Sequence, residues 1–197
     1  MLHKICLILT VFALLFGLSV SALAQTKKFS GTSKGRFTEL IKAAREGKSK
    51  ANPEIVKQIE SAYSEEKSEN PLAFGSIVGT WNVTVQGDGG FNALQTFSVD
   101  GTFTETSSLL STLTEGPAHG VWEYRRRGLA LTFEVFEFDP GTGEPIGRVR
   151  VRNFIQLTDG DNFSSIFTVD FIELDGTVIE NIGSGTFTGE RMQLRGL

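Results

Sequence analysis

The stretch IGRVRVRNFIQLTDGDNFSSIFTVDFIELDG, residues 146–176, decides the fold class of this chain. Valines alternate with arginines over residues 148–152, and apolar residues alternate with polar ones over much of residues 163–171. A period of two predicts β-strands with one buried face. Between the two runs, Asp159-Gly160 supplies the positive φ angles that a tight hairpin turn needs. The stretch therefore predicts two long antiparallel strands joined by a hairpin.

Strand-like runs separated by turn signals continue on both sides of this stretch, and no helical pattern interrupts them after residue 77. The expected strands cover residues 78–86, 91–99, 102–106, 120–125, 129–138, 146–157, 162–174, 177–182 and 185–194. Parallel strands need long crossover connections, usually helices, and this part of the chain has none, so the strands are expected to be antiparallel. The prediction is a mainly β fold, an antiparallel up-and-down meander of eight or nine strands that closes into a barrel and so has no exposed edges. A β-sandwich is the alternative.

Residues 1–24 have the organisation of a secretory signal peptide. A short basic start is followed by an apolar run over residues 5–18 and by small residues that end in Ala22-Leu23-Ala24. Cleavage after Ala24 would leave a soluble secreted or periplasmic protein. The apolar run is shorter than the roughly 20 residues of a membrane span, and an uncleaved anchor helix is the alternative.

Removal of this segment also removes Cys6 and His3, which leaves the mature chain with no thiol and with His119 as its one histidine. This excludes disulfides, a thiol nucleophile and multi-histidine metal sites, so we expect no metal and no cofactor. With 19 basic and 23 acidic side chains the chain is acidic, which disfavours nucleic acid as a partner.

The composition changes near residue 76, and this divides the mature chain into segment 25–76 and a barrel domain, 77–197. The first segment contains all the lysines that remain after cleavage, whereas the basic residues of the second are all arginines. Helical spacing of apolar residues predicts a helix over 36–46, and Asn52-Pro53 predicts the start of another. These one or two short helices either cover the barrel or bind a partner.

Gly79-Thr80-Trp81 matches the G-x-W signature that opens the first strand of lipocalins, and it stands at the start of the predicted meander. From residue 77 onward the chain resembles a bacterial lipocalin-like domain with an added N-terminal helical segment. The resemblance implies that a basic residue of the last strand, here Arg191, packs across the ring of Trp81. An allene oxide cyclase-like barrel is the second resemblance.

One apolar face per strand predicts a barrel interior that is either filled by side chains or holds a small ligand. The expected interior residues, and thus the candidate ligand-binding residues, are Phe97, Phe133, Val151, Phe167, Val169 and Phe171. A slip of one residue would instead turn Phe136, Phe138 and Phe154 inward.

No catalytic residue is assigned from the sequence. The carboxylates within the strands are interpreted as lying on the outer face of the barrel, where they pair with arginines of neighbouring strands. The carboxylates are Glu105, Glu123, Glu134 and Glu137, and the arginines are Arg125, Arg148, Arg150 and Arg152. His119 is expected to be solvated or bonded to nearby backbone. Three functions follow: binding of a small apolar molecule, a structural or protein-interaction module with a filled core, and a barrel isomerase or cyclase that uses one of these ionisable groups. The lack of a recognisable catalytic set favours binding.

Overall fold

The computed structural model describes residues 36–68, 76–86, 90–108, 115–139 and 141–194. The predicted signal peptide, residues 1–24, lies outside these ranges. Within them, neither helix combines the length and the apolar character needed to cross a bilayer.

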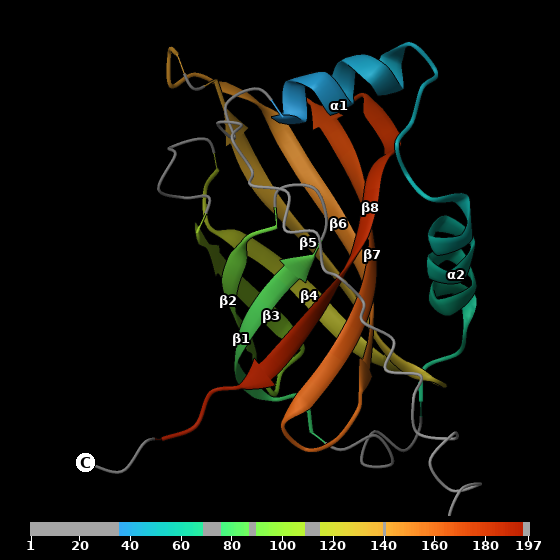
Figure 1. The fold of residues 1–197 in the computed structure, drawn as a ribbon, viewed down its shortest axis with the longest axis vertical. Helices are drawn as coiled ribbons and strands as arrows, with labels where there is room; N and C mark the ends of the chain where they lie inside the picture. Colours follow the sequence, from blue (N-terminus) through green and yellow to red (C-terminus); the bar gives the residue numbers. More distant parts are fainter. Residues whose placement is uncertain (1–35, 69–75, 87–89, 109–114, 140, 195–197) are drawn as a thin grey trace, which may run out of the picture. The chain divides into compact units, whose positions relative to one another are not determined.

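Eight antiparallel strands form a closed barrel in chain order, with the last strand paired to the first (Figure 1). The strands are β1 (Gly79–Gln86), β2 (Asn92–Phe97), β3 (Thr102–Ser107), β4 (Ala118–Arg125), β5 (Gly128–Phe138), β6 (Pro145–Leu157), β7 (Asn162–Glu173) and β8 (Val178–Arg191). This confirms the predicted meander and its closure into a barrel. Pairing of β1 with β8 removes both edges of the sheet, which a sandwich would not do.

The last two predicted strands are one strand, β8, with an irregularity inside it. Between Val169 and Phe171 the β7–β8 register shifts, and Asn181 on the opposite strand has a φ of 52°. A bulge accommodates extra residues while pairing continues on either side. The glycines near residue 183 therefore mark a bend rather than a turn.

Two helices precede the barrel, as the sequence predicted. Helix α1 spans Arg36–Arg45, and α2 spans Pro53–Ser64. The Asn52 side chain accepts a hydrogen bond from the Glu54 N–H at 2.9 Å, and Pro53 occupies the first turn. Both features satisfy or remove N–H groups that have no partner at a helix start.

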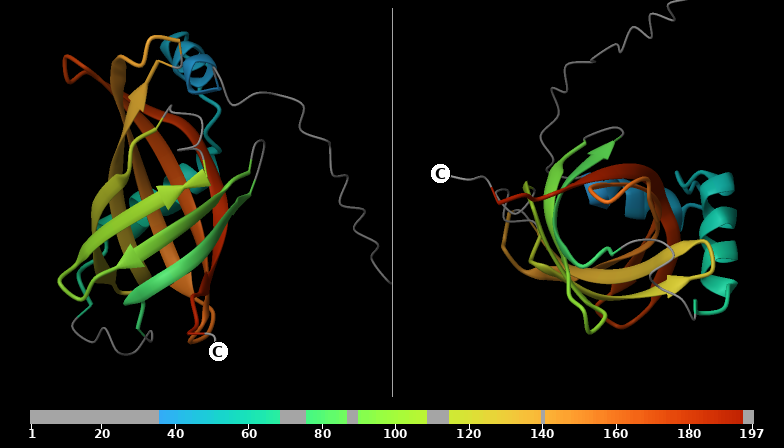
Figure 2. Two further views of the ribbon diagram at one scale, coloured as in Figure 1. Left: turned by 90° about the vertical axis from the view of Figure 1, so that its left-hand side faces the viewer. Right: turned by 90° about the horizontal axis from the view of Figure 1, so that it is seen from below.

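The helices pack on the barrel with their apolar faces, at an end and along the wall respectively (Figure 2). From α1, Ile41 is buried in the main core, flanked by Leu40 and Ala44. From α2, Ile59 and Ala62 are buried against Phe154 on the outside of β6. Packing on the barrel therefore accounts for the apolar stripes of both helices.

Tyr63 anchors α2 to the gap between two strands. Its hydroxyl donates to the carbonyl of Leu131 in β5 and accepts from the backbone N–H of Asn153 in β6 at 3.2 Å. Leu131 and Asn153 are directly opposite in the strand register, so the phenol oxygen bridges β5 and β6. Burial raises the pKa of the Tyr63 hydroxyl above its ordinary value, which keeps this donor protonated.

Replacement of Tyr63 by phenylalanine should lower the free energy of unfolding by about 1–3 kcal/mol, because two buried backbone groups lose their partner. Urea unfolding would measure the change. Glu60→Gln, at an exposed position of α2, is the control and should stay within about 0.5 kcal/mol of the parent. A Tyr63→Phe value in that same range would contradict the bridging role.

The register that turns Phe133 and Phe167 toward the interior is the one adopted, and the slipped alternative is not. Phe136 is 55% exposed on the outer face, and Phe154 lies under α2. Phe138 is half-buried at the end of β5, where the β5–β6 register shifts.

The expectation that the polar face of β7 meets solvent is wrong at two positions. Thr168 is fully buried and Asp170 is 3% exposed. Asp170 accepts from Arg152 at 3.2 Å and from the backbone N–H of Asn181 at 2.9 Å. The bulge of β8 thus encloses an ion pair on the outside of the barrel, which alternation along one strand cannot reveal.

Candidate functional site

One end of the barrel is closed around Trp81, which is fully buried. Its indole N–H donates to the carbonyl of Ile77 at 2.8 Å, and the guanidinium carbon of Arg191 lies 4.2 Å from the ring centroid. Arg191 also donates to the backbone carbonyls of Val78 and Gly160, each at 2.9 Å. Trp81 and Arg191 therefore act as a structural closure.

The glycine of the Gly79-Thr80-Trp81 motif is explained by the same closure. Gly79 has a φ of +131°, and a Cβ there would lie 2.9 Å from the Arg191 Nη1 atom. A larger residue would be strained and would displace the arginine from the indole.

Aromatic side chains fill this half of the barrel. Trp81 lies 4.9 Å from Phe163, and Phe97 lies 5.1 Å from Phe103, between ring centroids. Phe103 in turn stacks on Phe133 at 5.2 Å. Phe97, one of the predicted ligand-binding residues, belongs to this filled region.

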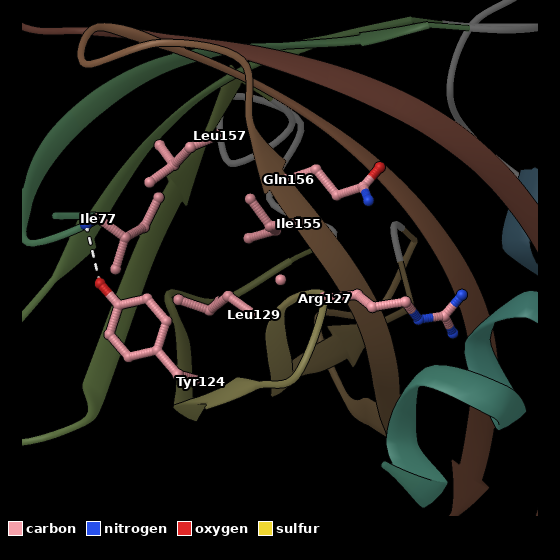
Figure 3. A pocket seen from close by; sticks show the side chains of 8 residues that line it. Ile77, Tyr124, Arg127, Leu129, Ile155, Gln156 and Leu157 are labelled. Atoms are coloured by element: carbon pink, nitrogen blue, oxygen red, sulfur yellow. Dashed lines mark hydrogen bonds between the residues drawn. The ribbon is translucent and has the colours of Figure 1, made fainter. Parts of the chain in front are cut away.

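A small cavity of about 110 Å³ lies beside the closure, between Ile77, Leu129 and Ile155 (Figure 3). The hydroxyl of Tyr124 accepts from the backbone N–H of Ile77 at 3.3 Å. The side chain of Arg127 points away from this apolar group and pairs with Glu65. The pocket thus presents mainly apolar surface, with its charged residue turned elsewhere.

Another cavity, of about 90 Å³, lies in the half of the barrel toward α1. Four predicted interior residues line it; they are Phe133, Val151, Phe167 and Val169. Phe171 does not, because its ring packs over the backbone of Gly147, where a Cβ would come within 2.4 Å of it. We refer to this space as the interior cavity.

Polar side chains interrupt the apolar lining of the interior cavity. Gln95 of β2 donates through Nε2 to Glu105 of β3 at 2.6 Å, and Glu115, just before β4, accepts from Ser107 at 3.0 Å. Asn153 of β6 completes the set. Gln95 is 1% exposed and Asn153 is fully buried.

Several atoms of these buried amides lack a hydrogen-bond partner within the described part of the chain. They are the Oε1 atom of Gln95 and both side-chain polar atoms of Asn153. A buried amide without a partner costs about 1–3 kcal/mol. Such a cost in a cavity lined by valines and phenylalanines indicates a place where a ligand or ordered water supplies the missing bonds.

The prediction that all four strand carboxylates lie on the outer face is wrong for Glu105 and Glu137. Glu105 shares the inward face of β3 with Phe103, and Glu137, 2% exposed, shares that of β5 with Phe133 and Val135. In each strand, the series of alternate residues that faces the interior therefore includes a glutamate.

The other two carboxylates do pair with arginines outside the barrel. Glu134 accepts from Arg148 at 2.7 Å and from Arg150 at 3.1 Å. Glu123 pairs with Arg125 and also with Lys67.

Burial shifts the inward carboxylates toward their neutral form. It raises the pKa of Glu105 to about 7 and that of Glu137 to about 9, and Glu115 adds to both shifts through charge repulsion. Burial also raises the pKa of Glu115. Near neutral pH, small changes in surroundings therefore decide whether Glu105 carries a charge.

His119 lies in β4 with an exposed side chain and takes no part in the interior cavity. Over the described ranges, no group of three or more histidine, cysteine, aspartate or glutamate residues is placed to hold a metal ion.

Sequence reasoning missed Gln95, Glu115 and Asn153 as residues of the site. Two of them carried a signal: Gln95 is spaced two residues from Phe97, and Asn153 two residues from Val151. A polar residue in phase with an inward apolar series deserves the same weight as the apolar residues around it.

Comparison with known proteins does not assign the chain to a family. No family model, no curated protein and no solved structure matches it. Its architecture, a closed eight-stranded antiparallel barrel with short helices, is consistent with a lipocalin-like barrel.

Proposed function

We propose that this protein is an exported, lipocalin-like barrel that binds a small, mainly apolar molecule in the interior cavity. The observation that carries the proposal is the fully buried side-chain amide of Asn153, which has no hydrogen-bond partner among the described residues and lies beside valine and phenylalanine side chains. Sites for small molecules combine an apolar lining with a few polar groups that fix orientation.

The size of the interior cavity limits the ligand. A water molecule takes up about 30 Å³ in the liquid, so a cavity of about 90 Å³ suits a compact molecule of a few non-hydrogen atoms. An interaction module is less well supported, because the apolar stripes of α1 and α2 pack on the barrel itself.

Titration of the full mature protein with butan-1-ol, followed by two-dimensional NMR, tests the proposal. Butanol combines a short apolar chain with one hydroxyl. We expect saturable shifts of the side-chain amide signals of Gln95 and Asn153. Native mass spectrometry of protein purified from its own host would show any retained ligand. The absence of both saturable amide shifts and a retained ligand would overturn the proposal.

Asn153→Leu should raise the free energy of unfolding by about 1–2 kcal/mol, because the unpartnered amide gives way to an apolar group of similar size. The same change should greatly weaken butanol binding, because it removes the polar group that would bond the butanol hydroxyl. Urea unfolding and NMR titration measure the two effects.

Asn82→Leu is the matched control, because Asn82 is exposed on the outer face of β1. It should change neither stability by more than about 0.5 kcal/mol nor butanol binding. A destabilised Asn153→Leu protein that still binds butanol would show that Asn153 is a structural residue.

A further inference from the structure

The interior cavity is unbalanced in both charge and hydrogen-bonding character. Two of the residues that line it are glutamates, Glu105 and Glu115, and among the described residues of its lining there is no lysine, arginine or histidine. The unpartnered oxygens of Gln95 and Asn153 add two further acceptors. Against these acceptors, within the described residues, stands the unpartnered Nδ2 group of Asn153 with its two N–H donors.

An ammonium group complements this arrangement. It carries three N–H donors, no acceptor and one positive charge. It would satisfy the amide oxygens and offset the repulsion between the two carboxylates. A ligand carboxylate or phosphate would instead add negative charge to a buried acidic space, which is strongly unfavourable.

We propose that the ligand of the interior cavity is a small organic ammonium compound, with its nitrogen held by Glu105 and Glu115 and its short apolar chain lying among the valines and phenylalanines. This inference rests on the proposed function and narrows it to one chemical class. Gln95 positions Glu105 through the 2.6 Å hydrogen bond and presents its own oxygen as a further acceptor.

The surroundings of Glu105 determine how binding depends on pH. Opposite it in the sheet lie Gln95 of β2 and Ala118 of β4, and Glu115 is the titratable group that acts on it. The α1 residues that pack into the core are Leu40, Ile41 and Ala44, which do not titrate. Burial raises the pKa of Glu105 to about 7, so ammonium binding should strengthen as the pH rises from 6 to 8.5. A simple alkylamine, with a pKa near the value of about 10.4 for lysine, stays charged throughout.

Three probes of matched chain length test the inference on the full mature protein: butylammonium, butan-1-ol and butyrate. At pH 8.5 we expect butylammonium to bind at least tenfold more tightly than butanol and butyrate not to bind. Glu105→Gln should weaken butylammonium binding at least tenfold and weaken butanol binding much less, because butanol carries no charge for Glu105 to pair with. Glu134→Gln, on the outer face, should change neither.

The results separate the inference from the proposed function. Butanol binding equal to or tighter than butylammonium binding would overturn the ammonium class and leave the binding site intact. Binding of neither probe would overturn both. If Glu105→Gln fails to give a folded spectrum, Glu115→Gln takes its place, with the same tenfold loss expected and an unchanged butylammonium affinity again counting against the inference.

Discussion

Alanine in place of Trp81 should lower the free energy of unfolding by about 3–5 kcal/mol. The indole is fully buried, packs on Phe163, donates to the carbonyl of Ile77 and lies under the guanidinium of Arg191. Its removal opens a cavity and takes away the surface on which Arg191 rests. Since domains are stable by about 5–15 kcal/mol, the variant should be close to unfolding at physiological temperature.

Chemical denaturation followed by circular dichroism measures this loss, and Phe136→Ala is its control. Phe136 is also an aromatic residue of a strand, but it is 55% exposed on the outer face, so its replacement should cost less than about 1 kcal/mol. A Trp81→Ala cost no larger than that of the control would mean that the closure does not stabilise the barrel.

Glu137→Gln should stabilise the protein by several kcal/mol at pH 9 and have little effect at pH 4. Burial and the nearby Glu115 raise the pKa of Glu137 from about 4.5 to about 9. In the folded state the carboxyl thus keeps its proton over a range where the unfolded chain has released it. Folding then binds a proton, and stability falls as the pH rises, by about 1.4 kcal/mol per pH unit.

The window follows from the two pKa values. The free energy of unfolding of the parent protein is highest below pH 4.5, where Glu137 is protonated in both states. It falls progressively between pH 4.5 and pH 9, where only the folded state holds the proton. Glutamine does not titrate, so the variant escapes this loss. Urea unfolding of both proteins at pH 4, 7 and 9 would show a difference that grows with pH.

Glu134→Gln is the control for this pH series. Its carboxylate lies three residues before Glu137 in β5, on the outer face, and pairs with Arg148 and Arg150. Its removal takes away favourable charge pairs, so no gain at pH 9 is expected. Equal pH profiles for parent and Glu137→Gln would refute the buried, neutral state of Glu137.

The sequence predicted the fold well because its signals are local. Alternation over 148–152 marks a strand through the geometry of the pleat, and Asp159-Gly160 marks a turn through its backbone preferences. Asn52 and Pro53 mark a helix start for similar reasons. None of these signals depends on what lies across the molecule.

The candidate site was predicted only in part. Phe133 and Val151 line the interior cavity as expected, because apolar residues in phase along a strand share one face. Glu105 and Asn153 were not expected there, since a charged or amide residue on an amphipathic strand ordinarily faces water.

By itself, the sequence determined most of the strand and turn positions, the two helix starts and the meander order, all of which arise from neighbouring residues. Tertiary structure alone decided that α2 covers Phe154, that the bulge of β8 encloses Asp170, and that Glu105 faces a cavity while Phe97 faces a filled core. Whether a residue is buried depends on what packs against its face of the strand. Alternation along one strand specifies only that its two faces differ.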